Sequence, residues 1–178
     1  MYYILVILCA YAIGSSSMSF YIGQLKGINM KEKGSRNLGA SNAMIVLGWK
    51  YGILVGVHDI AKSALAVILA THFFPKLPHI GAVAGVASVL GHIFPFYLKF
   101  KGGKGFASYI GMTFALNWKL ALIICVVIVL ATLITDYIVV GTTLSITIVP
   151  TFFGIVTKGW VAPLILLIAT IVIIYKHR

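Results

Sequence analysis

The sequence LALIICVVIVLATLIT, at residues 120–135, contains no charged side chain and decides the kind of fold to expect. A helix that crosses a bilayer needs about 20 predominantly apolar residues, and this stretch has the composition of such a helix. Two more apolar stretches follow at residues 137–157 and 160–175, with only short breaks between them. We therefore expect three closely joined membrane-spanning helices at the end of the chain.

Four further apolar stretches precede these, at residues 2–25, 38–74, 80–98 and 106–116. The second of them is too long for one membrane helix and is interrupted by glycines and charged residues, so we expect a partial or re-entrant helix near residues 38–57. The pattern predicts an all-α integral membrane fold with seven transmembrane helices and an interrupted second segment. It also predicts a single polytopic membrane domain over residues 1–178.

The composition excludes an ordinary soluble domain. Hydrophobic residues make up 61% of the 178 residues, charged residues make up 10%, and the mean hydropathy is +1.06. Soluble domains are about half apolar and about a quarter charged. Because seven helices use almost the whole chain, no room is left for a separate soluble catalytic domain. Any chemistry must come from the helical bundle and its loops.

The formal net charge of +11 predicts an orientation rather than a nucleic-acid partner, because cytoplasmic loops of membrane proteins carry an excess of Lys and Arg. The loops near residues 26–37 and 99–105 share one predicted side with the C-terminus. The first apolar stretch is expected to be a retained span and not a removed signal peptide. The N-terminus is then outside and the C-terminus cytoplasmic, with these cations on the cytoplasmic side: Lys26, Lys31, Lys33, Arg36, Lys99, Lys101, Lys104, Lys176 and Arg178.

Two of these loops have residues suited to an anion. Residues 31–42 read KEKGSRNLGASN and residues 100–105 read FKGGKG. Glycines allow the backbone to approach a phosphate, and lysines supply the opposite charge. Two alternatives remain open: residues 31–42 could form a plain cytoplasmic turn, and residues 100–105 could form a basic turn that contacts lipid headgroups.

Few side chains offer other chemistry. Asp59 and Lys62 lie one helical turn apart inside an apolar stretch, which indicates either a functional pair or a structural ion pair. Five scattered histidines and three acidic residues provide no convincing metal site. Cys9 and Cys125 both lie within apolar stretches and are expected to be packing residues. We therefore expect neither a metal nor a cofactor.

The chain resembles the bacterial membrane acyl-phosphate:glycerol-3-phosphate acyltransferase family over nearly its whole length. Residues 34–42, GSRNLGASN, are similar to the first signature of that family, G-S-G-N-x-G-A-T-N. Asp59 and Lys62 match its D-x-x-K. Residues 91–95, GHIFP, and 100–105, FKGGKG, match its second signature, and His177 matches the histidine that opens its third, H-R-E-N.

The resemblance implies transfer of a fatty acyl group from acyl phosphate to glycerol 3-phosphate, which gives lysophosphatidic acid for phospholipid synthesis. It implies a multi-pass protein of the bacterial cell membrane, in contact with membrane lipid, whose active site faces the cytoplasm. The residues implied to be catalytic are Ser35, Asn37 and His177. Those implied to bind substrate or phosphate are Arg36, Gly39, Asn42, Asp59, Lys62, His92, Lys101, Gly102, Gly103, Lys104 and Gly105.

Several positions depart from the family pattern. Ile45 stands where the family usually has Arg, Arg36 stands where it usually has Gly, and Asp136 replaces the Arg of a T-R-Y motif. The sequence ends at Arg178, before the Glu and Asn of the third signature. These departures keep open a family member with another acceptor or with little activity. A membrane anion carrier that uses the same basic loops is a further alternative.

Overall fold

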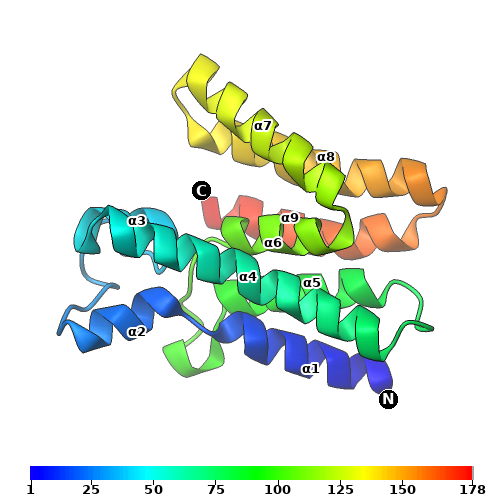
Figure 1. Ribbon diagram of the computed structural model, residues 1–178, viewed down its shortest axis with the longest axis horizontal. Helices are drawn as coiled ribbons and strands as arrows, with labels where there is room; N and C mark the ends of the chain where they lie inside the picture. The colour runs from blue at the N-terminus through cyan, green and yellow to red at the C-terminus, as the bar shows by residue number, and fades with distance from the viewer. Residues whose placement is uncertain (178) are drawn as a thin grey trace.

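The computed structural model describes residues 1–177, and every regular element in that part of the chain is helical (Figure 1). The prediction of an all-α fold is therefore confirmed for the described residues. The α-helices are α1 (Tyr2–Ser15), α2 (Met18–Leu25), α3 (Ala40–Leu47), α4 (Trp49–Phe73), α5 (Ile80–Ile93), α6 (Phe106–Leu116), α7 (Trp118–Thr135), α8 (Ile138–Thr157) and α9 (Val161–His177). A short 3₁₀ turn, η1 (Phe96–Leu98), follows α5.

Five helical stretches are long and apolar enough to cross a membrane, namely Tyr2–Leu25, Trp49–Phe73, Ile80–Leu98, Trp118–Thr135 and Ile138–Thr157. The apolar helices α6 and α9 are shorter. The lengths thus agree with a polytopic membrane protein, whereas the count of seven transmembrane helices remains a prediction.

The interruption in the second apolar segment lies at Gly48. This residue adopts a φ of 96°, a conformation that favours glycine, and it separates α3 from α4. The prediction that the partial helix extends to about residue 57 is wrong, because residues 49–57 belong to the continuous helix α4. Gly52 and Gly56 do not break α4, since both face α3, and a Cβ on Gly52 would lie 2.9 Å from the Met44 Cα.

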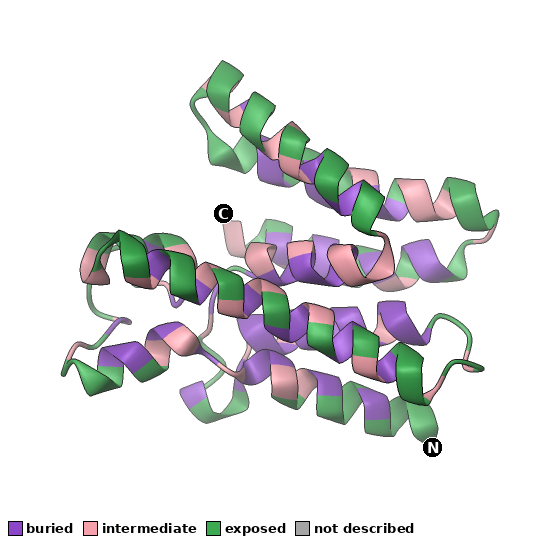
Figure 2. Cartoon of the chain, viewed as in Figure 1, coloured by how far each residue is buried: buried purple, intermediate pink, exposed green. Residues whose placement is uncertain are grey.

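Helix α5 lies at the centre of the bundle and is buried along almost its whole length (Figure 2). Small residues in α5 permit close packing: a Cβ on Gly91 would lie 2.2 Å from the carbonyl oxygen of Tyr11 in α1. By contrast, apolar side chains of α7 such as Leu130 and Ile134 are exposed. An outer surface of this kind is expected where a protein faces lipid instead of water.

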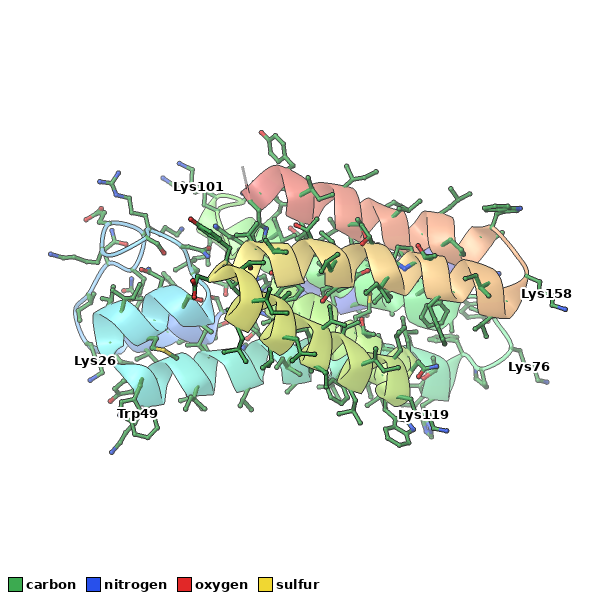
Figure 3. All side chains as sticks on the ribbon, turned by 90° about the horizontal axis from the view of Figure 1, so that it is seen from above. Lys26, Trp49, Lys76, Lys101, Lys119 and Lys158 are labelled. Atoms are coloured by element: carbon green, nitrogen blue, oxygen red, sulfur yellow. The ribbon has the colours of Figure 1, made fainter. Side chains whose placement is uncertain are left out.

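The basic loops gather at one end of the bundle. Figure 3 shows Lys26 and Lys101 at this end and Lys76, Lys119 and Lys158 at the opposite end. The end of α9 lies beside the loop that follows α5, and Lys176 Nζ is 5.0 Å from the centre of the Phe94 ring. We call this the basic end; its assignment to the cytoplasm remains a prediction. Arg178, which belongs to the same predicted group, lies outside the described residues.

Candidate active site

Asn42 organises the loop between α2 and α3. Its side chain is fully buried, and Oδ1 accepts a hydrogen bond from the Ser35 amide at 2.7 Å. Its Nδ2 group donates to the carbonyl oxygens of Asn37 at 2.7 Å and Met30 at 3.2 Å. A Cβ on Gly34 would lie 2.3 Å from Asn42 Oδ1, so glycine is required there. Asn42 thus holds the loop in place, and its amide is already occupied by protein partners.

This arrangement leaves three predicted site residues at the surface of the loop. Ser35 and Arg36 are exposed, and Asn37 is half-buried. Arg36 has a φ of 58°, in the left-handed region that L-residues rarely adopt. Gly39 caps the N-terminus of α3 in an extended conformation. The loop therefore presents a hydroxyl, a guanidinium and an amide side by side along the chain at the basic end.

The glycine-rich loop before α6 folds back onto the end of α5. The Gly102 amide donates to the Ile93 carbonyl at 3.0 Å, and the Gly103 amide donates to the His92 carbonyl at 3.1 Å. These two amides are therefore committed to α5. Gly105, with a φ of 93°, ends the loop and caps α6.

The amides that remain available for an anion are those that follow Gly103. The first N–H groups of α6 have no acceptor within the helix, as at any helix N-terminus, and the helix dipole favours negative charge there. Lys101 and Lys104 are exposed beside this terminus. A helix N-terminus flanked by two lysines is an arrangement that suits phosphate.

Lys31 connects the loop before α3 to the segment before α6. Nothing in the sequence distinguishes it from the other lysines of these loops. Its Nζ donates to the carbonyl oxygen of Leu98 at 2.9 Å. Burial, together with the positive charges of Lys101 and Lys99, lowers the pKa of Lys31 below its ordinary value. Leu98 packs in the buried cluster that also contains residues of the first loop, Met30 and Leu38. The two loops therefore form one basic surface.

Asp59, Lys62 and His92 lie beneath this surface. They are 1%, 5% and 6% exposed, respectively. Lys62 Nζ lies 2.8 Å from Asp59 Oδ1 and 2.9 Å from His92 Nδ1. Asp59 and Lys62 thus form a buried ion pair, and this geometry fits both a functional and a structural role. None of these three side chains is displayed on the loop surface with Lys101 and Lys104.

His177 lies at the end of α9, where its Nδ1 donates to the Ile173 carbonyl at 2.9 Å. A cavity of about 230 Å³ opens beside it between α8 and α9, lined by Val139, Thr142, Thr143, Ile146, Ile174 and His177. Neither threonine belongs to the signature-like loops of the sequence. The sequence feature that could have indicated them is a pair of adjacent hydroxyl side chains, Thr142 and Thr143, in an otherwise apolar stretch.

Two of the positions that depart from the family pattern have exposed side chains. Ile45 is 71% exposed on α3. Asp136 is exposed in the left-handed turn between α7 and α8. Among residues 1–177, no group of three or more His, Cys, Asp or Glu side chains is arranged to hold a metal ion.

Fold and site together define a class: integral membrane proteins with a phosphate-suited basic surface at one end of a helical bundle. More specifically, the chain belongs to the glycerol-3-phosphate acyltransferase family, whose sequence model matches residues 4–178. It is 41% identical over 148 residues to glycerol-3-phosphate acyltransferase 1 of Oceanobacillus iheyensis, which covers 79% of this chain and 72% of that protein. It is 36% identical over 180 residues to the glycerol-3-phosphate acyltransferase of Bacillus subtilis, which covers 98% of this chain and 89% of that protein.

A solved structure agrees with these relatives. The crystal structure of PlsY (YgiH), an integral membrane glycerol 3-phosphate acyltransferase, in its glycerol 3-phosphate form has a TM-score of 0.89 and 31% sequence identity to this chain. The comparison covers 100% of this chain and 89% of that one. The lysophosphatidic acid form of the same protein gives a TM-score of 0.87. The similarity in sequence thus extends to the whole arrangement of helices.

Proposed function

We propose that this protein transfers a fatty acyl group from an acyl phosphate to the 1-hydroxyl of glycerol 3-phosphate and so forms lysophosphatidic acid. The reaction takes place at the cytoplasmic face of a bacterial cell membrane, where the donor chain comes from the lipid phase and the acceptor from water. Membership of the acyltransferase family supports the reaction class. The phosphate groups of both substrates fit the charge of the basic end.

One observation carries the proposal. The N-terminus of α6, with Lys101 and Lys104 beside it, is joined to the loop of Ser35 and Arg36 through the hydrogen bond from Lys31 to Leu98. A phosphate bound at α6 is then held next to a second set of polar groups. Such an arrangement can orient two phosphate-bearing molecules toward each other, which lowers the entropic part of the barrier.

The donor is already activated, which suits the scarcity of bases in this chain. The hydroxyl oxygen of glycerol 3-phosphate forms a bond to the acyl carbon, and the bond between that carbon and the phosphate oxygen breaks. The phosphate leaves with the bonding electron pair and takes up the hydroxyl proton. Of the three carboxylates, Asp59 is buried and paired, and Glu32 and Asp136 are exposed. In the proposal the departing phosphate accepts the hydroxyl proton, so the transfer requires no carboxylate base.

The protein then contributes orientation and electrostatic stabilisation. In the proposal, Lys104 and the first amides of α6 bind the donor phosphate and stabilise its developing charge. Ser35 and Asn37 face the reacting carbonyl, and His177 with its cavity receives part of the acceptor. Arg36 supplies a cation from the loop before α3, whereas Ile45 within α3 stands where the family usually has Arg.

A donor and acceptor panel tests this proposal. Purified protein in lipid nanodiscs receives palmitoyl phosphate or palmitoyl-coenzyme A, with glycerol 3-phosphate, glycerol or dihydroxyacetone phosphate as acceptor. We expect lysophosphatidic acid and an equal amount of inorganic phosphate from palmitoyl phosphate with glycerol 3-phosphate. Faster product formation with another acceptor would revise the acceptor, and product from palmitoyl-coenzyme A alone would contradict the donor.

A further inference from the structure

The ammonium group of Lys62 connects three separate parts of the fold. It donates to the Ser16 carbonyl at 2.6 Å, to Asp59 Oδ1 at 2.8 Å and to His92 Nδ1 at 2.9 Å. Ser16 lies at the break between α1 and α2, Asp59 lies in α4, and His92 lies in the last turn of α5. All three donor positions of the ammonium are thus occupied by protein acceptors, which is what a buried charge requires.

The His92 ring contacts both members of the ion pair through Nδ1. His92 Nδ1 lies 2.9 Å from Lys62 Nζ and 3.3 Å from Asp59 Oδ1. Because an ammonium can only donate, the shorter contact assigns the acceptor role to Nδ1 and places the proton of a neutral ring on Nε2. The Nε2 corner of the ring lies against Gly103, where a Cβ would be only 2.1 Å away. The backbone carbonyl of His92 also accepts the Gly103 amide. A continuous chain of contacts therefore runs from Lys62 through His92 to the glycine-rich loop.

Helix α6 is held to the same network from its other side. The Ser108 hydroxyl, in the first turn of α6, donates to the backbone carbonyl of Asp59 at 3.1 Å. One turn later a Cβ on Gly111 would lie 2.0 Å from the Ile60 carbonyl oxygen, so α6 approaches the backbone of α4 closely there. The N-terminus of α6 is therefore held between His92 and Asp59.

The network also reaches the other loop. His58 Nε2 lies 3.1 Å from Ser16 Oγ, while Lys62 holds the Ser16 carbonyl. Ser17 caps α2, and α2 leads directly into the loop that presents Ser35 and Arg36. The starting point of that loop is thus tied to the same ammonium as the glycine-rich loop.

We propose that Lys62 is a positioning residue that holds the two phosphate-facing loops in register through His92 and Ser16, without itself touching substrate. This inference rests on the proposed function, because it concerns the loops that the proposal assigns to phosphate. It differs from the sequence-based prediction that Asp59, Lys62 and His92 bind phosphate directly.

Three variants test the role of Lys62 in turnover. Lys62→Met removes the charge at similar length, Lys62→Arg keeps a buried cation, and Ser63→Ala removes the 2.8 Å hydrogen bond between Ser63 and Ser88, which also joins α4 to α5. We expect Lys62→Met to raise the KM for glycerol 3-phosphate by about tenfold and to lower kcat. Lys62→Arg should recover most of this loss, and Ser63→Ala should leave both constants within about twofold of wild type.

The proposal is overturned if folded Lys62→Met keeps both constants of wild type, or if Lys62→Arg is as impaired as Lys62→Met. Should Lys62→Met fail to fold, Ser108→Ala tests the same network, because it removes the hydrogen bond between α6 and the backbone of Asp59, the residue that pairs with Lys62. We expect it to raise the KM by about threefold with no larger loss of thermal stability than Ser63→Ala. Wild-type kinetics in Ser108→Ala would contradict the proposal.

Binding of glycerol 3-phosphate, measured by calorimetry on the same variants, separates this inference from the proposed function. Absence of turnover in the wild-type protein removes the proposed function. If the wild type binds glycerol 3-phosphate and Lys62→Met binds it about tenfold more weakly, the positioning role stands regardless of turnover. Equal affinity of these two proteins, or no binding by the wild type, contradicts the positioning role.

Discussion

The Nε2 corner of the His92 ring occupies the space that a side chain at Gly103 would need, with only 2.1 Å between Nε2 and the position of a Cβ. This relationship explains why the loop before α6 requires glycine at that position. Lys62 Nζ contacts Nδ1 of the same ring at 2.9 Å and restrains its position. The packing of His92 against Gly103 therefore helps to determine where the N-terminus of α6 lies.

Substitution Gly103→Ala is expected to destabilise the protein by about 1–3 kcal/mol, as overpacking of a buried site does. His92→Asn shortens the side chain and keeps an acceptor for Lys62, so the added methyl group should then fit. The double variant should therefore lose less stability than the sum of the single variants, with a coupling of about 1 kcal/mol. Thermal unfolding of the four proteins in detergent measures this coupling, and strictly additive losses would refute the contact.

Lys31 should make phosphate binding dependent on pH. Burial and the charges of Lys101 and Lys99 lower the pKa of Lys31, and a bound phosphate counteracts this by favouring the ammonium. Binding of glycerol 3-phosphate should then weaken as the pH rises from the lowered pKa toward the pKa of the phosphate complex. In the protein without substrate, the charged form of Lys31 lowers the free energy of unfolding. This destabilisation is fully present below the lowered pKa and disappears as the pH rises and Lys31 loses its proton.

Calorimetric titrations between neutral and alkaline pH measure this effect. Lys31→Met should bind more weakly at neutral pH and lose this part of the pH dependence. Lys119→Met, which removes a lysine from the opposite end of the bundle, is the control. An unchanged pH dependence in Lys31→Met would separate Lys31 from the phosphate site.

The packing of α3 on α4 predicts opposite outcomes for two glycines in successive turns. A Cβ on Gly52 would lie 2.9 Å from the Met44 Cα, whereas a Cβ on Gly56 would meet the Ala40 Cβ at an ordinary 3.5 Å. Gly52→Ala should therefore lower thermal stability. Gly56→Ala should be neutral or gain up to about 1 kcal/mol from better helix propensity. Equal effects of the two substitutions would mean that α3 does not pack in this way.

Arg36 should contribute charge to acceptor binding from a strained backbone position. Asn tolerates the left-handed conformation, so Arg36→Asn removes the charge and keeps the backbone. We expect a rise of about threefold in the KM for glycerol 3-phosphate that shrinks at high salt, without a loss of thermal stability. Lys33→Asn, which removes another exposed lysine of the loop, should have a smaller effect. Similar effects of Arg36→Asn and Lys33→Asn would show that Arg36 contributes no more to acceptor binding than any other surface charge of the loop.

The helical fold and the grouping of the basic loops could be predicted from sequence, because apolar length and charge asymmetry are local signals. The residue at which the interruption of the apolar segment 38–74 ends could not be predicted from sequence. Gly52 and Gly56 suggest a weak helix, whereas in the structure they lie within a continuous α4 and against α3.

The two loops that the sequence predicts for the candidate site lie at one end of the bundle, whereas the roles of their residues depend on contacts that the sequence does not show. Asn42 and Gly103 belong to signature-like loops, yet their amides are occupied by protein partners. Sequence position alone cannot show whether a hydrogen-bonding group is already satisfied. Lys31 illustrates the converse, since only the three-dimensional contact with Leu98 distinguishes it from the neighbouring lysines.

The most direct test of the central claim is the rate of lysophosphatidic acid formation from palmitoyl phosphate and glycerol 3-phosphate by purified protein in nanodiscs. Wild type, Lys104→Ala and Lys119→Ala are compared, so that one cation is removed from each end of the bundle. We predict turnover by wild type and Lys119→Ala at similar rates, and a loss of about a hundredfold in kcat/KM for Lys104→Ala. Absence of product from folded wild type, or equal activity of Lys104→Ala and Lys119→Ala, would contradict the account.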